Sequence, residues 1–152
     1  MIEIVGDLWH YHREGAWCCI TTNGYVKRDG RLVMGRGCAQ EAAQRFPDLQ
    51  HQLGDLVARK GNHVFPLAQY TLLSFPVKHT WDQRADLDLI RRSAEELMAL
   101  LADPFSPVDP PVILPRPGCG NGGLLWRDVA PILEGILDQR VQVLCRPFEA
   151  LA

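Results

Sequence analysis

Two glycine-rich segments of this sequence have the composition of phosphate-binding loops. The first runs from Asn23-Gly24 to Met34-Gly35-Arg36-Gly37, and the second is Pro117-Gly118-Cys119-Gly120-Asn121-Gly122-Gly123. Each follows a short apolar run and precedes a segment with helical periodicity. Glycine lets the backbone approach a ligand closely, and a helix N-terminus presents unpaired N–H groups with a favourable dipole. These are the groups that bind phosphate.

Each segment by itself could equally be a tight turn. Gly118, Gly120 and Gly123 match the pattern G-x-G-x-x-G, but a single match is a weak signal. A Rossmann domain would place that loop after its first strand, whereas here it lies near the end of the chain. The Walker pattern of nucleotide triphosphatases is absent. Two such junctions in one small domain favour a diphosphate site over two unrelated turns.

The segments that must position these loops alternate between strands and helices. Short apolar runs predict strands over Met1–Val5, Trp17–Thr22, His63–Leu67, Tyr70–Val77, Val112–Leu114 and Val141–Cys145. Apolar residues at helical spacing predict helices over Cys38–Phe46, Leu49–Arg59, Ala85–Ala102 with Asp82 or Asp86 as its cap, and Leu125–Ile136. This order predicts an α/β protein, a three-layer α/β/α sandwich with a mixed, largely parallel sheet. Loops that follow parallel strands meet at the carboxyl edge of a sheet, so both glycine loops can close on one ligand.

The composition describes an ordinary globular protein. The 152 residues suit a single domain, and 47% of them are hydrophobic and 22% charged. The formal charge of −2 gives no reason to expect general attraction to nucleic acids or membranes, so any such contact must come from a local patch. Five cysteines at irregular spacing, with no C-x-x-C pair, predict free thiols, no metal site and a reducing compartment. The chain begins directly in a strand and has no membrane-length apolar run, so we expect a cytoplasmic protein. We also expect a monomer.

Four ordered motifs resemble the macrodomain family of ADP-ribose-binding proteins. They are Gly6-Asp7-Leu8, Thr22-Asn23 with Met34-Gly35-Arg36-Gly37-Cys38-Ala39, the stretch from Ser74 to Trp81, and Leu114-Pro115-Arg116 followed by the second glycine loop to Leu124. The resemblance covers nearly the whole chain and implies a single macrodomain over residues 1–152 that needs no cofactor. The ADP-ribose site that it implies comprises Asp7, Leu8, Thr22, Asn23, Gly35, Arg36, Gly37, Cys38, Pro117, Gly118, Cys119, Gly120, Asn121, Gly122, Gly123 and Leu124.

One branch of that family is most similar in its motifs. Ser74-Phe75-Pro76-Val77-Lys78-His79-Thr80-Trp81 is similar to the Phe-Pro-Thr-Lys-x-x-Trp stretch of the DNA ADP-ribosyl glycohydrolase antitoxins. The resemblance implies hydrolysis of an ADP-ribosyl bond on a nucleic acid or protein, a toxin partner, and Lys78 as the catalytic residue. A lysine that loses its proton through desolvation can attack the anomeric carbon of the distal ribose. Lys78 can equally be a solvated residue that ends a strand.

Other functions and roles stay open at this stage. A non-catalytic ADP-ribose reader, an ADP-ribose 1''-phosphate phosphatase and another dinucleotide-binding module all fit two glycine loops. Gly122 stands where relatives that release ADP-ribose from glutamate carry Asp, which disfavours that activity. The basic insertion Gly24–Arg31 can meet a phosphate or form a solvated hairpin. Cys119 is a reactive thiol or a small loop residue, and Trp81 and Trp126 wall the pocket or belong to the core.

Overall fold

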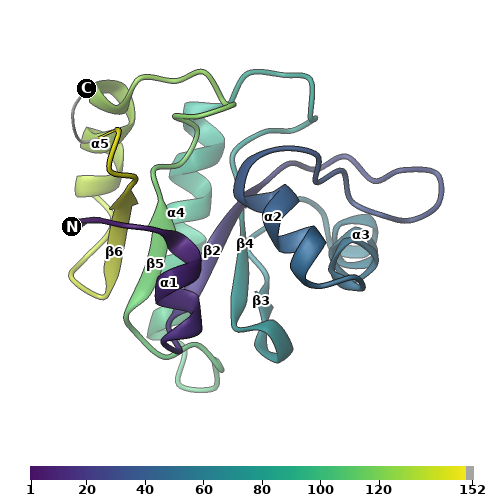
Figure 1. Ribbon diagram of the computed structural model, residues 1–152, viewed down its shortest axis with the longest axis horizontal. Coiled ribbons are helices and arrows are strands. Elements are labelled where there is room, and N and C mark those ends of the chain that lie inside the picture. The colour runs from purple at the N-terminus through teal and green to yellow at the C-terminus, as the bar shows by residue number, and fades with distance from the viewer. Residues whose placement is uncertain (150–152) are drawn as a thin grey trace.

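The structure is a computed structural model that describes residues 1–149. Its strands are β1 (Ile2–Val5), β2 (Trp17–Thr22), β3 (Pro66–Leu67), β4 (Leu72–Pro76), β5 (Val112–Pro115) and β6 (Val141–Cys145). Its helices are α1 (Leu8–Arg13), α2 (Gly37–Arg45), α3 (Leu49–Lys60), α4 (Leu87–Ala102) and α5 (Trp126–Glu134), with a 3₁₀ turn at Ala68–Tyr70. The strands form one sheet in the order β1-β6-β5-β2-β4-β3, and Figure 1 shows the helices packed against it.

The sheet is mixed, as the sequence predicts. β1 pairs with β6, β6 with β5, β5 with β2 and β2 with β4, all in parallel, and only the short β3 runs antiparallel to β4. The central strand β2 pairs Cys18 with Leu72 on one side and with Ile113 on the other. The carboxyl ends of β2, β4, β5 and β6 therefore lie along one edge of the sheet. The mixed sheet covered by helices confirms the predicted fold class.

Adjacent cysteines show the two faces of the sheet. Cys18 and Cys19 are both buried, but Cys18 packs with residues of α1, α2 and α3, whereas Cys19 packs with residues of α4 and α5. Successive side chains of a strand point to opposite faces, so one apolar run serves both cores. Burial raises the pKa of the Cys18 thiol to about 12 and that of Cys19 well above its usual value. Both thiols are free and protonated at neutral pH.

The structure departs from the expected elements in two places. The six-residue helix α1 follows β1 directly and is too short to show helical periodicity in the sequence. The expected pair of strands over 63–77 is reduced to β3 and β4, because a 3₁₀ turn and Thr71, with a φ of 55°, separate them.

At the start of α4, Asp86 and not Asp82 is the cap, since its carboxylate accepts a hydrogen bond from the Asp88 N–H. No helix within residues 1–149 is long and apolar enough to cross a membrane.

The insertion after β2 is packed onto α3. Leu32 is fully buried, its N–H donates to the Gln50 carbonyl at 2.9 Å, and the Gln50 side chain donates back to the Leu32 carbonyl at 3.1 Å. Gly54 of α3 faces this loop, and a Cβ there would overlap the Gly30 carbonyl oxygen and lie 2.9 Å from the Leu32 nitrogen. Figure 1 shows the loop reaching past α2 above α3. Its Gly30–Leu32 end is therefore held in place by α3.

Gly54→Ala tests this packing through the sign of its effect. Alanine in a helix interior normally stabilises by about 1 kcal/mol relative to glycine. Here the overlap with the Gly30 backbone should reverse the sign and lower the free energy of unfolding by about 1–3 kcal/mol in urea denaturation. Gly135→Ala, whose Cβ would make only ordinary contacts at 3.6 Å or more, should be neutral or stabilising. A stabilising Gly54→Ala would show that the loop does not rest on α3.

Candidate functional site

A cleft of about 660 Å³ opens at the carboxyl edge of the sheet. Five of its lining residues each follow one of the parallel strands: Asp7 after β1, Asn23 after β2, Lys78 after β4, Arg116 after β5 and Arg146 after β6. Open α/β sheets bind ligands at this edge, and the volume is that of a typical small-molecule site.

The first glycine loop enters the cleft together with the start of α2. Gly35, Arg36, Gly37 and Cys38 all line it. The Cys38 sulfur lies 3.4 Å from both the N–H and the hydroxyl of Thr21, which ties the first turn of α2 to β2. The free N–H groups and the positive end of the helix dipole of α2 therefore belong to the cleft wall.

Asn23 holds this loop in shape. Its side-chain amide donates to the Val33 carbonyl at 2.9 Å and accepts from the Tyr25 N–H at 2.9 Å. The two bonds join the ends of the insertion. No residue of 24–31 lines the cleft, so the basic side chains of the insertion face elsewhere.

The second glycine loop is a tight turn that also lines the cleft. Gly118 has a φ of +77°, and a Cβ there would lie 2.8 Å from Ile90 of α4. A Cβ on Gly122 would lie 2.5 Å from the Gly118 carbonyl oxygen. The Gly118 carbonyl also accepts from the Leu124 N–H at 2.9 Å, which closes the turn. Gly118 and Gly122 are therefore required by the fold itself.

Gly35 and Gly120 have no such structural reason to be glycine. Both are exposed and line the cleft, a Cβ on either would meet nothing within 4 Å, and neither has a positive φ. Alanine would fit each position in the empty protein. The lack of a side chain at these two positions is an advantage only if a ligand approaches the main chain closely.

Four of the expected site residues do not line the cleft. Pro117 is buried, the Cys119 sulfur turns back to the Pro117 carbonyl at 3.5 Å, the Gly123 carbonyl accepts from Arg84 at 2.8 Å, and Leu124 packs on the core. The first turn of α5 is not in the lining either. Of the two glycine loops, only the first is followed by a helix whose first turn lines the cleft.

Lys78 extends from the loop after β4 and is half-buried in the cleft wall between Val77 and Trp81. Its amine donates to the Trp81 carbonyl at 3.4 Å. His79 faces away from the cleft, and its Nε2 lies 2.8 Å from the Asp86 carboxylate, which lowers the pKa of Asp86. Trp81 lies in the wall with about half of its surface exposed, whereas Trp126 is outside the cleft.

The sequence analysis named Arg116 only as part of a motif and did not assign it or Arg146 to the site, although both are cations of the cleft. Arg116 stacks on Trp126 at 4.7 Å and lies 3.7 Å from Glu3, and its buried Nε has no hydrogen-bond partner among the described residues. Arg146 pairs with Glu149 at 3.0 Å. Each directly follows a parallel strand, and that position is the signal that could have revealed them. Within residues 1–149, no three His, Cys, Asp or Glu side chains are grouped as metal ligands.

Comparisons with known proteins identify the fold. No family model matches the sequence, and no curated protein matches it significantly. Among solved structures, Thermosipho africanus DarTG in complex with ADP-ribose aligns with 97% of this chain at a TM-score of 0.75 and 20% identity. The Thermus aquaticus DarG macrodomain aligns over 94% of this chain and 95% of its own, at a TM-score of 0.71 and 24% identity. The Mycobacterium tuberculosis DarG macrodomain aligns over 95% of this chain and 98% of its own, at a TM-score of 0.72 and 24% identity.

This chain has the macrodomain fold. It spans 42% of the length of the DarTG chain and nearly all of the two DarG macrodomains. The fold resemblance expected from the four sequence motifs is thus confirmed. The macrodomain fold also explains why the motifs are so far apart in the sequence, because all four meet at one edge of its sheet.

The environment of Cys119 predicts an unreactive thiol. Burial raises its pKa to about 11, so at pH 7.5 the thiolate fraction is about 100-fold lower than at the usual value of 9.0. The stronger nucleophilicity of a high-pKa thiolate recovers part of this loss, and alkylation by iodoacetamide should be about 10-fold slower than for a solvated cysteine. Peptide mass spectrometry measures the rate, with urea-unfolded protein as the reference. Labelling of Cys119 at the unfolded rate would contradict the structure.

Proposed function

We propose that this macrodomain binds ADP-ribose in the cleft and hydrolyses the bond that joins ADP-ribose to a modified nucleic acid or protein. The observation that carries the proposal is the pair Gly35 and Gly120, two exposed glycines of the cleft that the fold does not need. At these two glycines a diphosphate can come close to the main chain of both loops, beside the first turn of α2, whose N–H groups can bind it. The DarTG structure with the same fold is a complex with ADP-ribose, which supports this ligand.

The described residues suggest a role for each end of the cleft. The Asp7 carboxylate is exposed, has no hydrogen-bond partner in the described chain, and is free to accept the exocyclic amine of adenine. Leu8 is buried beside it and offers an apolar surface. Lys78 and Asn23 line the cleft at the ends of the neighbouring strands β4 and β2. We assign the distal ribose to that part of the cleft.

The proposed reaction begins at the Lys78 amine. Its lone pair attacks C1'' of the distal ribose, and the bond from C1'' to the macromolecule breaks with its electron pair. The leaving group takes up a proton, and the amine releases one to solvent. Opening of the ribose ring gives an imine between Lys78 and ADP-ribose. Water adds to this imine and frees both the lysine and ADP-ribose, so that the net reaction consumes one water molecule.

A reader without catalysis is the second candidate, because the Lys78 amine already has a partner in the Trp81 carbonyl. The proposed substrate is an ADP-ribosylated macromolecule, and the proposed partner is a toxin that attaches the ADP-ribose. Both follow from the motif resemblance, and this chain corresponds to only part of the length of DarTG.

Ligand binding is tested with Gly120→Ala. ADP-ribose at 100 times its dissociation constant should stabilise the wild-type protein by about 2.7 kcal/mol. Gly120→Ala should keep the Tm of the empty protein, since its Cβ meets nothing within 4 Å, yet weaken ADP-ribose binding at least 10-fold by calorimetry, because the methyl group occupies the ligand's place. The remote Gly135→Ala is the control and should bind normally. No response of the wild type to millimolar ADP-ribose would refute the proposal, and normal binding by Gly120→Ala would remove its main support.

Catalysis is tested with Lys78→Ala. This variant should release ADP-ribose from modified DNA, RNA or protein at least 100-fold more slowly, while its affinity for free ADP-ribose changes less than threefold, because the amine acts on the reacting carbon and adds little to ground-state binding. Lys78→Arg should fail as well, since a guanidinium stays protonated. Borohydride should trap ADP-ribose on the wild type and not on Lys78→Ala.

The outcomes of this test separate the candidates. A Lys78→Ala variant with wild-type turnover would exclude the lysine mechanism. A wild type that binds ADP-ribose but releases none from any of these substrates would be a reader. Turnover of ADP-ribose 1''-phosphate alone would identify a phosphatase.

A further inference from the structure

The loop that carries Lys78 has an unusual feature: every carbonyl from Pro76 to His79 accepts a hydrogen bond. The Ser93 hydroxyl donates to Pro76 at 2.7 Å and the Asp86 N–H to Val77 at 2.9 Å. The Asn62 side chain donates to Lys78 at 3.0 Å, and the Gly24 N–H donates to His79 at 3.1 Å. Loops after strands are usually the mobile parts of a fold. This loop is therefore held by α4 and the residue before it, by the turn after α3 and by the first glycine loop.

Asn62 makes the bond to Lys78 itself. It lies in the turn after α3, and its Nδ2 must be the atom that faces Lys78, because a carbonyl can only accept. Its other atom, Oδ1, is buried with no hydrogen-bond partner in the described chain. An unsatisfied buried acceptor lowers stability, so packing alone does not explain an asparagine here.

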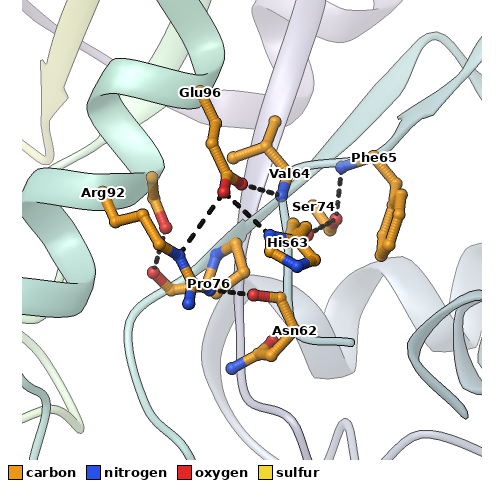
Figure 2. Close-up of polar contacts among 9 residues, drawn as sticks. Asn62, His63, Val64, Phe65, Ser74, Pro76, Arg92 and Glu96 are labelled. Atoms are coloured by element: carbon orange, nitrogen blue, oxygen red, sulfur yellow. Dashed lines mark hydrogen bonds and ion pairs between the residues drawn. The ribbon is translucent and has the colours of Figure 1, made fainter. Parts of the chain in front are cut away.

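Helix α4 in turn fixes Asn62. Arg92 donates to the Asn62 carbonyl. One turn further along α4, Glu96 accepts from the Val64 N–H at 2.9 Å and lies 2.8 Å from Nδ1 of His63. Glu96 also pairs with Arg92 at 3.4 Å. Figure 2 shows these side chains of α4 reaching across to the 62–65 segment. The backbone of Asn62 and of the two residues that follow it is thus anchored to a core helix.

Gly24 leaves room for this arrangement. A Cβ on Gly24 would lie 2.9 Å from the side-chain carbon and nitrogen of the Asn62 amide. The glycine after Asn23, read from the sequence as part of a ligand loop, is therefore required by Asn62. The first glycine loop contacts the Lys78 loop directly through the bond from Gly24 to His79, and the Asn62 side chain lies against both loops.

We propose that Asn62, anchored by Arg92 and Glu96, is a positioning residue that fixes the Lys78 amine against the distal part of the ligand. Asn62 does not line the cleft. It acts by holding the main chain from which Lys78 extends. A displacement of about 1 Å at a reacting group can cost about 100-fold in rate, so such a bond has a large effect on turnover. The inference rests on the function proposed above for Lys78.

Asn62→Asp tests the inference, because aspartate keeps the shape and removes the donor to the Lys78 carbonyl. Turnover should fall about 10- to 100-fold while the affinity for ADP-ribose changes less than threefold. In the wild type, bound ADP-ribose should also protect Lys78 from acetylation by acetic anhydride, measured by peptide mass spectrometry. Asn62→Asp should lose most of this protection. Glu96→Gln, which weakens the anchor, should shift both measurements in the same direction by less.

Gln50→Glu is the matched control. It makes the same change from amide to carboxylate and also removes a donor to a main-chain carbonyl, that of Leu32, while the backbone bond from Leu32 to Gln50 stays. Gln50→Glu should lower the Tm by about as much as Asn62→Asp does, yet it should keep wild-type turnover and the protection of Lys78. Equal losses in both variants, or wild-type turnover and protection in Asn62→Asp, would overturn the positioning role. If the wild type releases no ADP-ribose but only Asn62→Asp loses protection, the positioning role stands and hydrolysis is excluded.

Discussion

The parallel pairing of β2 with both β4 and β5 is the interaction on which the rest of this structure depends. It brings the residues after Thr22, Pro76 and Pro115 to one edge of the sheet. The Thr22 carbonyl then accepts from the Val77 N–H at 2.9 Å, so that the pairing continues into the Lys78 loop. A shift of register by one residue would turn Cys18 and Cys19 to the wrong cores and separate the loops.

The glycines of the cleft divide into two groups with different physical reasons. Gly118 and Gly122 allow a turn so tight that any side chain would overlap its neighbours. A Cβ on Gly35 or Gly120 would meet no atom within 4 Å. The first group builds the wall of the cleft, and the second leaves that wall open to a ligand. A motif such as G-x-G-x-x-G does not distinguish these reasons, because both appear in the sequence as the same residue.

Charge in the cleft is balanced locally. Arg146 is paired with Glu149, and Arg116 is stacked on Trp126 near Glu3. Arg36 lies at the start of α2, where the helix dipole adds to its positive charge. The cleft lining holds the four cations Arg36, Lys78, Arg116 and Arg146 and the three carboxylates Asp7, Glu41 and Glu149, so it is slightly positive in a chain with a net charge of −2. Behind it, α4 supplies the carboxylate and guanidinium that hold the 62–65 segment, so that the same helix supports the core and the cleft.

The sequence by itself determined the order of the strands and of every helix except the short α1. β2 and β6 have the predicted bounds, α2 to α5 lie within a few residues of theirs, and the motifs identified the macrodomain fold, because periodicity and turn residues act locally. Only the tertiary structure decided which loop residues face the cleft. It turned Pro117, Cys119, Gly123 and Leu124 away, brought in Arg116 and Arg146, and placed Asn62 beneath Lys78. These contacts join residues that are distant in the chain, and they depend on sheet register and helix packing, which no local pattern encodes.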